Sequence, residues 1–161
     1  MKIEGRLLQG TFIERLNRFL GKVEVAGNDQ FCYIPNPGRM IELLQFGVGV
    51  YLKEEQASAR RTGYDLIFVK QSHLISIDSR VPNRLVEEAI PLGLLPEFSG
   101  YDLANAEYTY GDSRFDFLLS CRDLRMLLEV KSCTLVRGGR ALFQTPQLSG
   151  GRGISAQSCQ P

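Results

Sequence analysis

The sequence of 161 residues has one histidine, four widely separated cysteines and no long apolar run. His73 lies in a strand-like segment that does not resemble a nucleophile elbow, which argues against a Ser-His-Asp hydrolase. The cysteines lack Cys-x-x-Cys spacing, so we expect reduced thiols rather than a zinc site. The apolar runs are too short to cross a membrane, and the N-terminus lacks the apolar segment of a signal peptide. We therefore expect a cytoplasmic protein with no membrane partner.

Net charge is nearly absent as well, because 19 Lys and Arg residues face 18 Asp and Glu residues and give +1. This balance argues against a strong general affinity for nucleic acid, so such a role would need locally clustered basic residues. Hydrophobic residues make up 43% of the chain and charged residues 23%, as in ordinary folded proteins with a real core. The length allows one or two small domains.

The first half of the chain consists of short strand-like segments separated by glycine-containing turns. Five such segments predict an OB-like five-stranded β-barrel over residues 1–80, a fold that closes its own edges at this size. Gly27–Asp29 predicts a hairpin turn, and Arg39–Leu44 predicts a turn or two of helix. The strand-like segments are Leu7–Glu14, Phe19–Val25, Phe31–Ile34, Val48–Lys53 and Tyr64–Lys70.

Basic residues of this half are candidates for contacts with nucleic-acid phosphates, which lysine and arginine neutralise. The alternative is that these arginines are solvated surface residues with no ligand. The candidates are Arg15, Arg18, Arg39, Arg60 and Arg61.

The pattern changes near Pro82. Asn83 predicts the N-cap of a helix with apolar positions that recur up to Ile90, and Pro91 predicts its end or a bend. Strand-like segments follow at Ala106–Tyr110 and further along the chain. The order helix, strand, strand, strand is the opening order of a restriction-endonuclease-like core.

Two apolar segments carry ionisable side chains, Arg114–Leu119 and Leu127–Ser132. Burying a charge is costly unless the charge is paired or binds a metal. Glu129 and Lys131 project from the same side of a strand, and Asp116 can join them if the two strands form a hairpin. This is the constellation of Mg²⁺-dependent PD-(D/E)xK nucleases. The alternative is a Glu/Lys pair at a strand edge with Asp116 in a satisfied turn.

In such a site Asp116, Glu129 and the carbonyl oxygen of Val130 would hold one or two Mg²⁺ ions, because Mg²⁺ prefers oxygen ligands. The metal would activate a water and stabilise charge on the scissile phosphate, and Lys131 would orient that water or neutralise the charge. Glu88, on the preceding helix, could complete the site from the side. The alternative for Glu88 is a solvated helix residue.

Five motifs together resemble the sugar fermentation stimulation protein A family. They lie at 18–20, 34–40, 81–89, 110–117 and 128–135. The resemblance implies an α+β two-domain protein, with an N-terminal OB-fold domain at residues 1–80 and a PD-(D/E)xK-like α/β domain from residue 81.

The same resemblance implies nucleic-acid binding and a role in regulating sugar-utilisation genes. It implies that Asp116, Glu129 and Lys131 occupy the nuclease positions and that Glu88 matches the helix acid. Three functions stay open: a DNA-binding protein, a Mg²⁺-dependent DNA endonuclease, and a protein-interaction module with a vestigial site.

The resemblance ends after Phe143, so the second domain is expected to be incomplete, with bounds 81–143. Residues 144–161 are rich in Gly, Ser and Gln and are expected to be disordered. Codons can be chosen for this tail whose neighbouring reading frame spells the family's continuation, which suggests a frameshift product. The alternative is a genuine short variant that ends in a linker.

Overall fold

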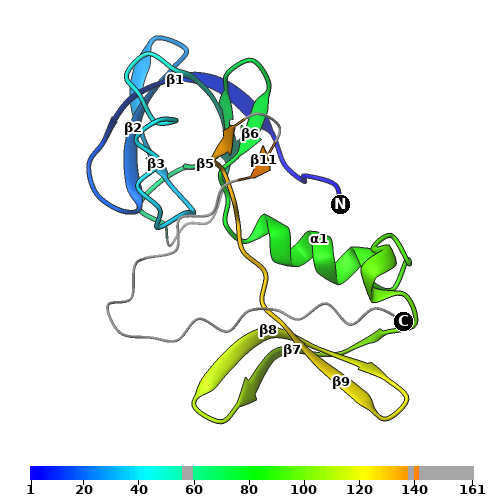
Figure 1. Cartoon of the computed structure of the whole chain (residues 1–161). Helices are drawn as coiled ribbons and strands as arrows, with labels where there is room; N and C mark the ends of the chain where they lie inside the picture. The colour runs from blue at the N-terminus through cyan, green and yellow to red at the C-terminus, as the bar shows by residue number, and fades with distance from the viewer. Residues whose placement is uncertain (56–59, 138–139, 142–161) are drawn as a thin grey trace.

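The computed structural model describes residues 1–55, 60–137 and 140–141. They form a six-stranded sheet, one α-helix, a three-stranded sheet and a short two-stranded pair. Figure 1 shows the six-stranded sheet and the three-stranded sheet at opposite ends of the molecule, with α1 between them. In the described part of the chain, no helix is long and apolar enough to span a membrane.

The six-stranded sheet has the strand order β3-β2-β1-β4-β5-β6. Strand β3 also pairs in parallel with β5, through Cys32–Tyr64 and Tyr33–Asp65, so the pairings β1-β2-β3-β5-β4 return to β1. All five expected strands are present, with ends that differ by up to three residues from the expected ones. The strands are β1 (Leu7–Arg15), β2 (Leu20–Val25), β3 (Asn28–Tyr33), β4 (Gly49–Glu54), β5 (Tyr64–Lys70) and β6 (Leu74–Ser76).

The β2–β3 hairpin turns one residue earlier than predicted. Val25 pairs with Asn28, which leaves Ala26 and Gly27 as a two-residue turn with φ of 51° and 79°. Two consecutive positive φ angles define the turn that matches the twist of a hairpin, and Gly27 adopts its angle without strain. The predicted turn or two of helix is a single turn, in which the N–H groups of Leu43 and Leu44 donate to the Met40 carbonyl.

Inward-pointing side chains of these strands and four residues of the adjoining segments form one core. The buried members are Phe12, Val23, Cys32, Ile34, Met40, Leu43, Val50, Leu52, Leu66, Val69 and Ile77.

Helix α1 (Val81–Ala89) begins two residues before the predicted N-cap. Arg80 is the N-cap and makes no side-chain capping hydrogen bond, and Pro82 occupies the first turn, where its fixed φ suits a helix start. The prediction of Asn83 as the cap was therefore wrong. Asn83 is therefore a residue of the helix interior, and its side-chain amide can contact another element.

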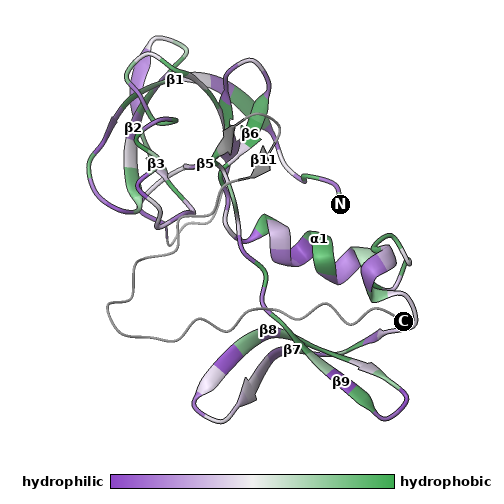
Figure 2. Ribbon diagram, in the orientation of Figure 1, coloured by the Kyte–Doolittle hydropathy of each residue, from purple (hydrophilic) through white to green (hydrophobic). Residues whose placement is uncertain are grey.

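The second region continues with a 3₁₀ turn (Pro96–Phe98) and the antiparallel strands β7, β8 and β9. The predicted order of one helix and three strands is present. Ile90, Phe117 and Leu119 form a small buried core between the helix end and the sheet. Figure 2 shows hydrophobic stretches on both α1 and β8. The strands are β7 (Asp102–Tyr110), β8 (Ser113–Cys121) and β9 (Leu124–Leu128).

The predicted strand Leu127–Ser132 extends too far, because β9 ends at Leu128. The backbone N–H of Val130 donates to the Asp116 carboxylate rather than to a carbonyl of β8, which ends the ladder. The chain then runs past α1 to β10 (Val136–Arg137) and β11 (Arg140–Ala141) (Figure 1). The predicted tail, 144–161, lies outside the described residues.

Candidate functional site

Asp116 joins three parts of the second region. It is half-buried in β8, and both of its carboxylate oxygens accept hydrogen bonds. Oδ1 accepts from the Asn83 side-chain amide of α1 at 2.7 Å, and Oδ2 accepts from the Val130 backbone N–H at 2.7 Å. A half-buried carboxylate with two donors is well satisfied.

Glu129 and Lys131 follow β9 and are the chain neighbours of Val130, whose N–H binds Asp116. The β8–β9 ladder ends at the pair Phe117–Leu128, before Glu129. Lys131 Nζ forms an ion pair with Glu129 Oε1, as expected for alternate residues that project to one side. Both side chains are exposed. The Glu129–Lys131 ion pair thus flanks Val130, whose N–H binds the Asp116 carboxylate, at this corner of the sheet.

Glu88 is directed elsewhere. Its carboxylate pairs with the N-terminal amine of Met1 at 2.7 Å. It lies five residues after Asn83, which is about 140° around the helix from the side that contacts Asp116. Within the described residues, no three His, Cys, Asp or Glu side chains gather closely enough to hold a metal. The structure thus does not bring Glu88 together with Asp116 and Glu129.

Asn83 is the contact that sequence reasoning missed. It shares a helix face with Val86 and Ile90, which pack against the small core. The spacing i, i+3, i+7 carries that information in the sequence. A polar residue on an apolar helix face signals a specific partner, which here is Asp116.

Within the described residues, the guanidinium group of Arg15 donates only to backbone oxygens, and it joins two loops. Burial and the nearby charge of Arg18 lower the pKa of Arg15. Through its hydrogen bonds, the guanidinium group holds the β1–β2 turn against the loop after β3. Its hydrogen bonds go to the carbonyls of Asn17, Arg18, Asn36, Gly38 and Arg39.

Arg18 and Arg39 are exposed at the place that Arg15 organises. With Arg15, they line a shallow depression of about 330 Å³. Arg61, in the loop before β5, is exposed too. Within the described chain, no ion pair involves the side chains of Arg18, Arg39 or Arg61.

Arg60 is more constrained than its neighbour. It forms an ion pair with the buried Asp65 and lies 3.7 Å from Glu55. Its guanidinium also lies over the ring of Tyr33, 5.6 Å from the centroid. Tyr33 in turn stacks on Phe19, with ring centroids 6.0 Å apart and an interplanar angle of 23°. Arg60 thus belongs to an aromatic surface as much as to an ion-pair network.

Two family models match this chain in succession. One, described as the SfsA N-terminal OB domain, matches residues 13–77, and the other, the sugar fermentation stimulation protein RE domain, matches residues 80–153. A sugar fermentation stimulation protein homolog of Caldanaerobacter subterraneus subsp. tengcongensis is 40% identical over 153 residues, which are 94% of this chain and 67% of that protein. The chain belongs to the sugar fermentation stimulation protein family. Its N-terminal region is the family's OB domain.

A second relative and a solved structure agree with this assignment. The homolog of Natranaerobius thermophilus is 43% identical over 151 residues, which cover 91% of this chain and 63% of that protein. The structure of Pyrococcus furiosus SfsA in complex with Ca²⁺ is 29% identical, with a TM-score of 0.79 over 89% of this chain and 62% of that chain. The chain thus spans about two thirds of the length of these family members.

A charged network lies where the OB domain of this family member meets α1. Arg80 donates to both carboxylate oxygens of the buried Asp78, at 2.9 and 2.7 Å, and lies 3.6 Å from the buried Asp65. The hydrogen bond to Asp78, with the charges of Asp78 and Asp65, raises the pKa of Arg80. The network therefore fixes the start of α1 to the OB domain.

Cys32, inside the OB core, is a poor nucleophile. Burial raises the pKa of the Cys32 thiol to about 12, so the nucleophilic thiolate is scarce at neutral pH. Cys32 and Cys121 are thiols rather than disulfide partners. His73 is exposed in the turn before β6. Cys159 lies outside the described residues.

Proposed function

We propose that this chain binds DNA through its OB domain, with β1–β5 acting as a closed OB-like barrel. The observation that carries the proposal is the gathering of exposed arginines on two loops. Arg18 lies between β1 and β2, and Arg61 lies between β4 and β5. These are the loops with which OB folds bind oligonucleotides. The biological role that fits this DNA binding is the regulation of sugar-utilisation genes in the cytoplasm.

Local charge, rather than bulk charge, supports this function. The whole chain has a net charge of only +1, so phosphate binding depends on clustered cations. Arg15 fixes the backbone of both Arg18 and Arg39 through their carbonyls. This organisation lowers the backbone entropy that the two loops lose when they bind a phosphate backbone.

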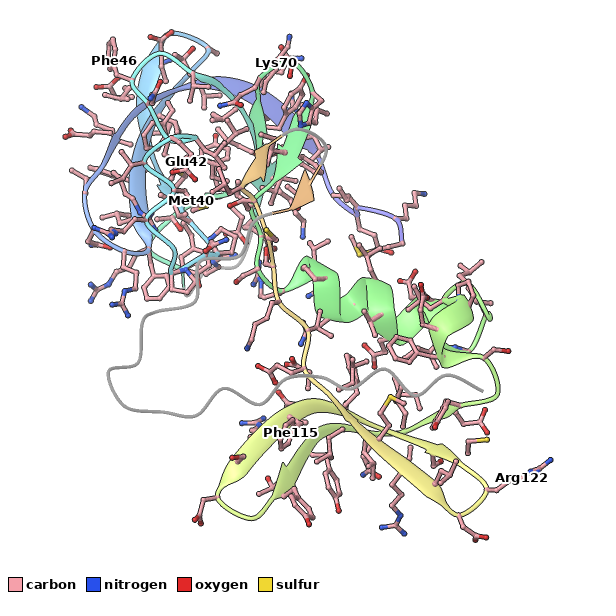
Figure 3. All side chains as sticks on the ribbon, viewed as in Figure 1. Met40, Glu42, Phe46, Lys70, Phe115 and Arg122 are labelled. Atoms are coloured by element: carbon pink, nitrogen blue, oxygen red, sulfur yellow. The ribbon has the colours of Figure 1, made fainter. Side chains whose placement is uncertain are left out.

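The test is the salt dependence of binding to a labelled DNA duplex, followed by fluorescence anisotropy. Arg18→Ala and Arg39→Ala should each weaken binding to all sequences and reduce the slope of log K against log salt by about 1. Lys70→Ala is the matched control, because Lys70 is exposed and lies at the opposite end of the OB domain (Figure 3). Binding that is independent of salt, or equally weakened by Lys70→Ala, would contradict the proposal.

A second candidate function is a Mg²⁺-dependent DNA endonuclease. The corner formed by Asp116, Glu129 and Lys131 supports it, and so does the Ca²⁺ that accompanies the Pyrococcus furiosus relative. The helix and three strands of this region agree with a restriction-endonuclease-like core. Two carboxylates and the Val130 carbonyl suit Mg²⁺, which takes oxygen ligands.

The chain's own residues would prepare this site. Asn83 and the Val130 N–H orient the Asp116 carboxylate, and Lys131 neutralises Glu129 until a cation replaces it. When bound, Mg²⁺ would supply an activated water and stabilise charge on the scissile phosphate.

Cleavage assays separate the two functions. The nuclease predicts cut products with Mg²⁺ or Mn²⁺ that disappear in Asp116→Asn, which keeps the side-chain shape and removes the charge. The binding function alone predicts DNA complexes that persist in EDTA, with no cut products. The absence of any salt-dependent DNA binding would favour the third alternative, a protein-interaction module.

A further inference from the structure

We propose that the outer face of β2 and β3 is a stacking platform for unpaired bases, so that the preferred ligand of the OB domain is single-stranded DNA. This inference rests on the proposed DNA binding and names its substrate class. The platform consists of Phe19, Phe31 and Tyr33.

Strand alternation places two of the rings side by side. Cys32 is fully buried in the core, so its neighbours Phe31 and Tyr33 project from the opposite, outer face of β3. They are separated by about 7 Å along the strand. Phe31 is 52% exposed, which is unusual for a ring that serves only packing. This face of β3 therefore presents the exposed ring of Phe31 beside the half-buried ring of Tyr33.

Phe19 extends the row at the β1–β2 loop. Its ring stacks on Tyr33, and 42% of the residue is exposed. The backbone at Phe19 is held firmly, because its N–H donates to Asn17 Oδ1 at 2.9 Å and its carbonyl accepts from Ile34 at 2.9 Å. The platform is thus largely formed before a ligand arrives.

Cations flank the rings. Arg60 lies over Tyr33, Arg18 precedes Phe19 in the loop, and Lys22 pairs directly opposite Phe31 in the β2–β3 ladder. Two of these cations also have acidic partners, since Lys22 contacts Asp29 at 2.6 Å and Arg60 pairs with Asp65. Arg18 is the exposed cation at the end of the row.

Alternating rings and cations suit a single strand better than other occupants. In a duplex the base faces are stacked on one another, so they are not accessible for stacking on the aromatic rings. A single strand offers both base faces and phosphates, which are the features that aromatic platforms and basic grooves recognise. An apolar protein surface would have to desolvate the flanking cations at a cost.

The test compares a labelled single strand of about 12 nucleotides with a duplex of the same sequence, using the full chain. We expect tighter binding of the single strand. Phe31→Ala should weaken single-strand binding roughly tenfold and leave duplex binding unchanged, because it removes a base contact and no charge. Phe46→Ala is the matched control, since Phe46 is 83% exposed outside β2 and β3 (Figure 3) and its loss should change neither affinity.

Phe19→Ala is a second variant at the other end of the row, and thermal unfolding checks that both variants are folded. Equal affinity for single strand and duplex, or single-strand binding unaffected by both variants, would overturn the platform while leaving DNA binding intact. No salt-dependent binding of either DNA would overturn the proposed function as well. Tighter binding of the corresponding RNA strand would overturn the choice of DNA.

Discussion

The two sheets of this protein differ in what holds them together. Among the residues that the structure describes, eleven buried side chains form the core of the six-stranded sheet, whereas three form the core beside the three-stranded sheet. In the first region apolar packing determines the structure, and the candidate ligand contacts lie outside on loops and on one strand face. In the second region Asp116 is a candidate site residue and also ties α1 to the sheet. Function and stability are therefore separable in the first region and coupled in the second.

The largest expected effect comes from the cores. Leu66→Ala and Leu119→Ala each remove a fully buried side chain and should cost about 2–5 kcal/mol of stability. Leu66→Ala should lower the free energy of unfolding of the OB domain. Leu119→Ala should remove protection mainly from β7–β9, which have the smaller core. Hydrogen exchange resolved by segment measures this, and equal loss of protection in both regions after Leu119→Ala would mean that the two unfold as one unit.

The same difference explains how much of the fold was predictable. Strands β1–β5 follow from alternation and glycine turns, because a closed core imposes a strict pattern on the sequence. The first residue of α1 and the last residue of β9 were not predicted correctly from the sequence. Pro82 started the helix before Asn83, and the Asp116 carboxylate replaced a backbone partner for Val130. The first event is a local preference of proline that outweighs the predicted cap, whereas the second depends on a contact between segments that are distant in sequence.

The candidate sites were predictable to a different extent. Strand period predicts that Glu129 and Lys131 share one side, and they form an ion pair, but β9 ends at Leu128. Their approach to Asp116 stays a prediction. The position of Glu88 did not follow, because a helix can turn either face to the sheet until its packing is known. The five carbonyl contacts of Arg15 arise from two loops that fold together, and no local pattern announces them.

Arg15 gives the next largest effect and tests whether the OB surface is built separately from its core. Arg15→Ala removes charged hydrogen bonds to two loops and should cost about 1.5–3 kcal/mol. Arg15→Lys should recover little, because an ammonium group lacks the planar fork that reaches several carbonyls. Urea unfolding measures both, and Arg18→Ala is the control with an expected change within about 0.5 kcal/mol. If Arg15→Lys is as stable as the parent, the positive charge at this position is sufficient and the planar guanidinium group is not needed.

The coupling of site and stability in the second region is tested at Asn83. Asn83→Ala leaves Asp116 Oδ1 without its donor from α1 and should cost about 1–3 kcal/mol. Arg84→Ala on the exposed side of the same helix is the control. If Mg²⁺ binds at Asp116, adding it should recover part of the stability lost in Asn83→Ala, because a ligand that binds the folded state stabilises it. If Asn83→Ala is as stable as the parent, the hydrogen bond to Asp116 does not stabilise the packing of α1 on the sheet.

The smallest effect compares two similar ion pairs, one in each region. The hydrogen bond and charge of Lys53 lower the pKa of Glu55 from its ordinary value of 4.5. A carboxyl group with a lowered pKa stabilises the fold above that ordinary value, and the contribution is lost as the pH falls through the lowered one. The pair is partly screened by solvent, so we expect about 0.2–1 kcal/mol at pH 7. Glu55→Gln should remove this amount at pH 7 and change nothing at a pH where Glu55 is protonated.

The Glu129 side chain is more exposed than that of Glu55, 39% against 24%, so Glu129→Gln should cost less stability. A larger cost for Glu129→Gln would mean that the second region depends on charge even at its surface.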